Sequence, residues 1–118
     1  MLWENAIEGY WLEKRRNVSV ATYTGYGYVL RGFRKFLGEQ PVHFEKITAD
    51  QVRSYLAHLH DSGLSPKSCS NAWVTLSSVW TWAEHELQFP HIIRGRIARP
   101  RYRRPAIEPY SKTEVRAM

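Results

Sequence analysis

Histidine, cysteine and tyrosine are the residues of this sequence that could take part in catalysis or metal binding, and their spacing favours neither. His58 and His60 fall on different sides of a predicted helix, and one cysteine cannot complete a zinc site with them. No carboxylate pair, glycine-rich phosphate loop or nucleophile beside a base has the spacing of an active site. We therefore predict that this chain has no catalytic residue, metal, cofactor or small-molecule substrate.

Lysine and arginine offer a different chemistry, the binding of anions. The 118 residues include 17 Lys and Arg against 11 Asp and Glu, a formal net charge of +6. Such a balance fits nucleic acid, an acidic protein surface or an anionic membrane. The sequence has no apolar run long enough to span a membrane and does not begin like a signal peptide, so we expect no membrane partner and a cytoplasmic location.

The basic residues are concentrated in three stretches that lack acids. The first lies between Glu13 and Glu39, the second is the start of a long helix after Ser65, and the third lies between Leu87 and Ile107. Any one of them could be a solvated polar face, but three together favour the phosphates and base edges of nucleic acid. Their candidate contact residues are Thr24, Tyr28, Arg31 and Lys35; Lys67, Ser68 and Asn71; and Arg94, Arg96, Arg99 and Arg101.

Four amphipathic helices would have to position these residues. Apolar periodicity and capping residues predict them over 3–16, 19–37, 48–60 and 65–87. Ser19 and Ser65 are the expected N-caps of the second and fourth, and Thr48 with Gln51 forms a capping box for the third. We therefore predict an all-α bundle with one core.

The fourth helix should be the centre of that bundle, because it is the longest and carries an apolar face with Trp73 and Trp80. Its opposite face, which continues from Asn71 to Thr75 and Ser78, is short, polar and free of acid, and we expect it to lie open to an anionic partner. Trp82 points away from the apolar face.

Beyond the fourth helix the composition changes. Prolines and arginines dominate residues 91–110, which predicts an extended basic linker following a domain at 1–90. A capping box at Ser111–Glu114 begins another helix, so we read 111–118 as the first residues of a truncated following domain.

The order of these elements resembles that of a known family. Three segments carry the pattern: Val20-Ala21-Thr22-Tyr23 leading to Phe36-Leu37, Ile47-Thr48 leading to Tyr55-Leu56, and Gly63-Leu64-Ser65-Pro66. Together they resemble the N-terminal core-binding, or SAM-like, domain of tyrosine recombinases of the phage integrase family, over about residues 5–118.

The resemblance implies an orthogonal bundle that forms half of a clamp on double-stranded DNA, within an assembly of recombinase protomers. The linker arginines would follow phosphates, and catalysis would belong to a domain after Met118. The spelling His91-Ile92-Ile93-Arg94 matches a family motif by coincidence. The DNA-facing residues implied are Thr22, Thr24, Gly25, Tyr28, Arg31, Lys67, Ser68 and Asn71.

Two alternatives remain at this point. The basic faces could bind an acidic protein, as in a helical protein-interaction module. The turn at Ser62-Gly63 before the fourth helix is also compatible with a helix-turn-helix regulator, although the fourth helix is long for a recognition helix.

Overall fold

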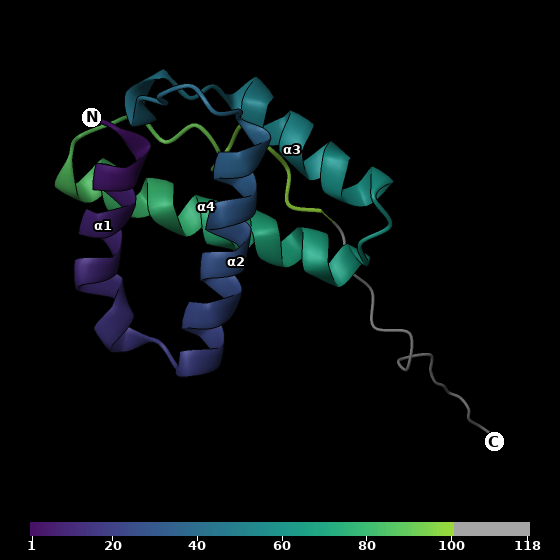
Figure 1. Ribbon diagram of the computed structural model, residues 1–118, viewed down its shortest axis with the longest axis horizontal. Helices are drawn as coiled ribbons and strands as arrows, with labels where there is room; N and C mark the ends of the chain where they lie inside the picture. Colours follow the sequence, from purple (N-terminus) through teal and green to yellow (C-terminus); the bar gives the residue numbers. More distant parts are fainter. Residues whose placement is uncertain (101–118) are drawn as a thin grey trace.

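The computed structural model describes residues 1–100 and consists of four main helices (Figure 1). Two short 3-10 helices, at Arg15–Asn17 and Phe44–Lys46, lie in the connections. The described part contains no strand, so the predicted all-α bundle is confirmed. None of its helices combines the length and apolar character required to cross a membrane. The main helices are α1 (Trp3–Lys14), α2 (Val20–Phe36), α3 (Ala49–Asp61) and α4 (Pro66–Glu86).

Three of the four main helices begin at their predicted caps, whereas α1 follows Leu2, which forms no side-chain cap. The hydroxyl of Ser19 accepts a hydrogen bond from the backbone N–H of the third residue of α2, at 3.1 Å, and that of Ser65 does the same for α4, at 3.2 Å. Thr48 and Gln51 form the reciprocal capping box of α3. Because each cap satisfies N–H groups that have no partner within the helix, local sequence is sufficient to set these starts.

The fourth helix is the central element, as predicted. It crosses behind α1 and α2 and packs against α1, α2 and α3 (Figure 1). Trp80 is only 2% exposed and stacks on Phe44 with ring centroids 4.6 Å apart, while Trp3 covers it from α1. The other buried residues of α4 include Cys69, Ala72, Leu76, Val79 and Ala83.

The polar face of α4 is open only over its first turns, which corrects the prediction. Thr75 is buried and donates its hydroxyl to the carbonyl of Asn71, and the Ser78 hydroxyl lies 2.9 Å from that of Tyr10. Trp82 also packs edge-on against Tyr10. The reason is that α1 and α2 cover α4 from more than one side.

Several aromatic residues lie nearer the surface than their apolar stripes predicted. Tyr23 and Phe36 of α2 are each 37% exposed. Trp73 is half-buried, and its indole N–H donates to the carbonyl of Ile97 at 3.0 Å. Only the middle of α2, at Leu30 and Phe33, is fully covered by the core.

The segment after α4 folds back on the bundle instead of forming an extended linker from residue 91. Ile93 and Ile97 are buried in the core. The ring of His91 is also buried, and its Nδ1 accepts hydrogen bonds from the backbone N–H groups of Ile93 and Arg94. The packed core therefore extends past the boundary predicted at residue 90. The remainder of the predicted linker and the helix start at 111–118 lie outside the described residues.

Candidate nucleic-acid interface

A hollow of about 490 Å³ opens between α2, the end of α3 and the first half of α4. Tyr55 and Leu59 come from α3, and Leu64 from the turn that joins α3 to α4. The α4 wall runs from Ser68 to Thr75, and the α2 wall from Ala21 to Val29. The hollow is thus built from three helices that the packing on α4 brings together.

Five of the predicted DNA-facing residues line this hollow. Thr22, Gly25 and Tyr28 recur every three residues along α2, so they share one side of that helix, and Ser68 and Asn71 share one side of α4. Tyr28 is 73% exposed, and the Asn71 side chain also reaches the surface. The structure therefore joins residues that are forty or more positions apart in the chain.

Two of the other predicted residues of these helices stand at the surface outside the hollow. Thr24 on α2 and Lys67 at the start of α4 are exposed but do not line it. They remain at the surface beside it, where their role stays a prediction.

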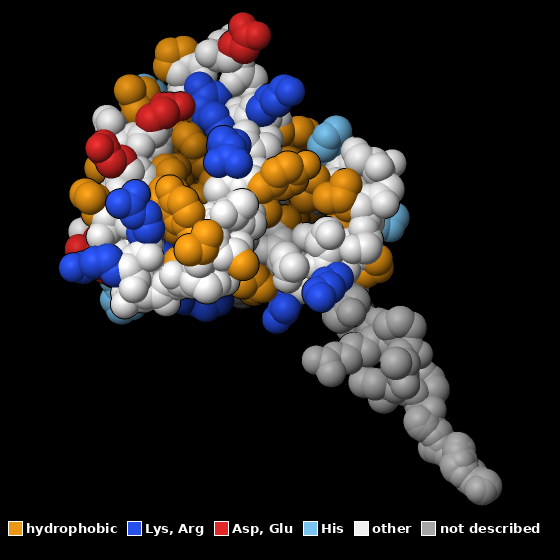
Figure 2. Space-filling view, turned by 60° about the horizontal axis from the view of Figure 1, so that its bottom comes forward, with side chains coloured by type: hydrophobic (Ala, Val, Ile, Leu, Met, Phe, Trp, Pro, Cys, Tyr) orange, Lys and Arg blue, Asp and Glu red, His pale blue; other side chains and the backbone are white. Residues whose placement is uncertain are grey.

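The charges around the hollow are of one sign. No Asp, Glu, Lys, Arg or His lines it, and an adjoining groove that shares Tyr28 and Leu64 with it is lined by Arg31, Lys35 and His58, again without an acid. On the face that Figure 2 shows, hydrophobic side chains gather near the centre, Lys and Arg stand around them, and the visible Asp and Glu lie at the top and along the left.

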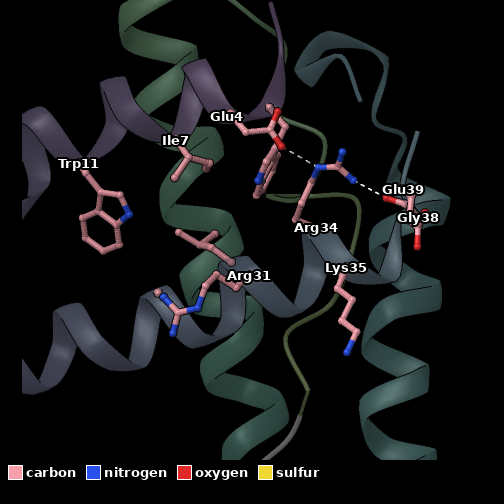
Figure 3. Close-up of a pocket in the computed structure, with 11 residues that line it drawn as sticks. Glu4, Ile7, Trp11, Arg31, Arg34, Lys35, Gly38 and Glu39 are labelled. Carbon is pink, nitrogen blue, oxygen red and sulfur yellow. Dashed lines mark hydrogen bonds and ion pairs between the residues drawn. The ribbon is translucent and has the colours of Figure 1, made fainter. Parts of the chain in front are cut away.

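Arg31 and Lys35 also border a cleft between α1 and α2, of about 650 Å³, whose apolar wall includes Ile7 and Trp11 (Figure 3). Neither cation forms an ion pair within residues 1–100.

Arg34 is held by the fold. Its guanidinium donates to the carboxylate of Glu4 and to the carbonyl of Gln40, each at 2.9 Å (Figure 3 shows the Glu4 bond). The hydrogen bond from Arg34 lowers the pKa of the Glu4 carboxyl group. Arg34 therefore connects α1 to the loop after α2, whereas Arg31 and Lys35 are available to a ligand.

The linker arginines lie apart from the hollow. Arg94 forms an ion pair with Glu84 at 2.8 Å and thereby lowers the pKa of that carboxyl group. The Nε of Arg99 donates to the hydroxyl of Ser70 at 2.7 Å. Arg96 is exposed, and Arg101 lies outside the described residues.

Two features of this surface were not predicted from the sequence. The apolar walls contributed by Leu59 and Leu64 depend on how α3 packs, and no local pattern signals that. The second is a basic corner, Lys14 to Arg16, just before α2, where the Arg15 guanidinium lies 5.9 Å from the ring centroid of Tyr23. The three consecutive basic residues are a signal for anion binding that the sequence does contain, but from sequence alone we interpret them only as the end of the first helix.

Within the described residues, no three His, Cys, Asp or Glu side chains gather in a way that could hold a metal ion. His91 is engaged within the fold, since both of its ring nitrogens have hydrogen-bond partners.

The fold and the hollow define the class of this protein, which is an all-helical domain whose central helix, α4, packs against the three others. Residues 7–87 match the family model for the N-terminal SAM-like domain of phage integrase. The chain therefore belongs to this family, whose members are tyrosine recombinases, and the resemblance noted from its sequence is confirmed. Neither the curated proteins nor the solved structures provide a match.

Proposed function

We propose that this chain is the DNA-binding core-binding domain of a site-specific tyrosine recombinase, gripping duplex DNA at the crossover site during integration or recombination. The observation that carries the proposal is the acid-free surface made by the hollow and by Arg31 and Lys35 beside it. Other recombinase protomers would be its partners in the full assembly, as the family suggests.

The chemistry of this surface suits two kinds of contact with DNA. Arg31 and Lys35 can neutralise phosphates and release condensed counterions, which gives affinity without sequence preference. The hydroxyls of Thr22 and Ser68 and the carboxamide of Asn71 can form hydrogen bonds to base edges, which gives preference. The groove that holds the cations adjoins the hollow and shares Tyr28 and Leu64 with it, so both kinds of group would be within reach of one duplex.

We further propose that this chain alone neither cleaves nor joins DNA. The support for this statement is that the family match, over residues 7–87, is to an N-terminal SAM-like domain and not to a catalytic domain. The test is incubation with a nicked or intact duplex followed by denaturing electrophoresis, in which a covalent protein–DNA adduct would refute the statement.

The binding proposal can be tested on a preferred duplex, selected by the protein from a random-sequence pool, and on a scrambled duplex of equal length. The wild-type chain should bind both, with affinity falling as salt rises. Asn71→Ala should weaken the binding free energy by about 1 to 3 kcal/mol on the preferred duplex and by little on the scrambled one, because a bidentate contact to a base contributes that much discrimination. Ser54→Ala, on the exposed side of α3, is the matched control.

Equal losses on the two duplexes would show that Asn71 does not read sequence. No salt-dependent binding to any duplex by the folded wild-type chain would remove the proposal itself.

Protein binding is a second candidate, and the apolar wall of the α1–α2 cleft is the observation that favours it. If an acidic protein were the partner, duplex DNA would fail to displace it. A helix-turn-helix regulator fits less well, because α4 spans 21 residues and is the buried centre of the fold.

A further inference from the structure

The hollow between α2 and α4 has the chemistry of a site for an uncharged, flat group. None of its lining side chains is an acid, a lysine, an arginine or a histidine. Its walls combine aromatic and aliphatic groups, such as Tyr28, Val29 and Leu59, with the hydroxyl and amide groups of Ser68 and Asn71. Apolar walls with a few polar groups are typical of sites that hold and orient a small planar ligand.

The surroundings of the hollow, in contrast, suit an anionic chain. The adjoining groove shares Tyr28, Tyr55, Leu59 and Leu64 with the hollow and adds Arg31 and Lys35. A molecule that places a neutral ring in the hollow and a phosphate beside these cations would match both environments. A nucleotide within a DNA strand has this combination.

The size of the hollow separates two ways of using it. A base that stays paired in the duplex could offer only its edge or a methyl group, whereas about 490 Å³ lies within the range of about 300 to 1,000 Å³ found for small-molecule pockets. Proteins that extrude a base hold it by stacking on aromatic or apolar side chains and by hydrogen bonds to its edge.

We propose that this hollow holds one extrahelical nucleobase of the bound DNA. Tyr28, which is 73% exposed, provides the stacking surface, and Asn71 hydrogen-bonds to the edge of the base. The proposal rests on the proposed function, since it assigns a base-binding role to the same surface. It adds that the surface prefers DNA in which a base is already unpaired.

Gly25 provides a way to close the hollow without disturbing the fold. A Cβ atom built at Gly25 meets no other atom within 4 Å, so a side chain there would enter the open space of the hollow. Glycine also destabilises a helix interior, so replacing it by alanine should stabilise α2 by up to about 1 kcal/mol. Gly25→Leu should therefore fold and occupy the hollow, and Gly25→Ala is the smaller step.

The experiment compares three duplexes of one sequence: fully paired, with one unpaired adenine, and with one unpaired abasic residue. The abasic duplex has the same bulged backbone but no base to insert. Because extruding a paired base costs a few kcal/mol and about 1.4 kcal/mol is a factor of ten, the wild-type chain should bind the adenine bulge about tenfold or more tighter than the paired duplex. The abasic bulge should not show this gain.

Gly25→Leu should abolish the preference for the adenine bulge over the abasic bulge, with Gly25→Ala in between. Equal binding of the two bulges by the wild-type chain would overturn the proposal and attribute any gain to the bent backbone. Preference retained in Gly25→Leu would also overturn it. If the wild-type chain binds the paired duplex but shows no preference for the adenine bulge, the proposed function stands and only this proposal fails. If the wild-type chain binds no duplex, both fail.

Discussion

Residues of the same type, one turn apart, have different roles here. Arg31 forms no ion pair within the described residues, whereas Arg34 bonds to Glu4 and to the carbonyl of Gln40. We predict that Arg31→Ala lowers the salt slope of DNA binding by about 0.9, one phosphate contact, and leaves the melting temperature unchanged. Arg34→Ala should instead cost about 1 kcal/mol of folding stability, discounted for the exposure of Glu4, and leave the slope unchanged.

Binding isotherms over a salt series and thermal melts of the two variants provide the check. A reduced slope in Arg34→Ala would mean that this arginine contacts phosphate in the complex.

A single buried histidine should make the stability of the domain depend on pH. Burial, together with the nearby charge of Arg94, lowers the pKa of His91, while Glu84 opposes the shift. Its Nδ1 accepts two backbone N–H groups, so Nε2 carries the proton of the neutral ring and donates to the Thr81 hydroxyl. The folded state therefore requires the neutral form.

Since the pKa of His91 is lower in the folded state than its unfolded value of about 6.5, the unfolded chain binds more protons between those two values. Stability should be complete above about pH 6.5 and decrease as the pH falls towards the folded pKa. Urea unfolding of the wild-type chain and of His91→Asn, from about pH 5 to 7.5, tests this. An identical pH slope in both would contradict the assignment.

At the scale of the element, α4 contains two tryptophans on one apolar stripe, and the structure distinguishes them. Trp80 is enclosed by Trp3 and Phe44, whereas Trp73 is half-buried under the segment that ends at Ile97. We predict a loss of about 3 to 5 kcal/mol for Trp80→Ala, because a buried indole leaves a cavity. Trp73→Ala should lower the free energy of unfolding by about 1 to 3 kcal/mol, because this indole is only partly buried and makes one hydrogen bond.

Denaturant unfolding of the two variants measures these free energies directly. Equal losses would show that the covering segment protects Trp73 as fully as the core protects Trp80.

At the scale of the whole molecule, the core continues past the end of α4. Ile93 is fully buried and Ile97 nearly so, and both belong to the cluster that includes Trp80. A chain ending at residue 90 should therefore be less stable than one ending at residue 100 by several kcal/mol, since each lost isoleucine removes about 2 to 5 kcal/mol.

The double variant Ile93→Ala, Ile97→Ala in the full chain is the control, because it removes the two side chains and keeps the length. If the chain ending at 90 melted at the temperature of the chain ending at 100, the boundary predicted from the sequence would be the right one.

Short-range patterns in the sequence determined the helices and the location of the acid-free stretches. Ser19, Thr48 and Ser65 cap their helices through hydrogen bonds to residues three positions later in the chain, so these contacts can be predicted from local sequence. Tertiary structure alone decided which polar groups remain open. The bond between Tyr10 and Ser78 joins residues 68 positions apart, and it lies on a face of α4 that by its own periodicity would be exposed but is partly covered by α1. The burial of Ile93 and the pairing of Arg34 with Glu4 likewise depend on contacts between distant segments, which no local period encodes.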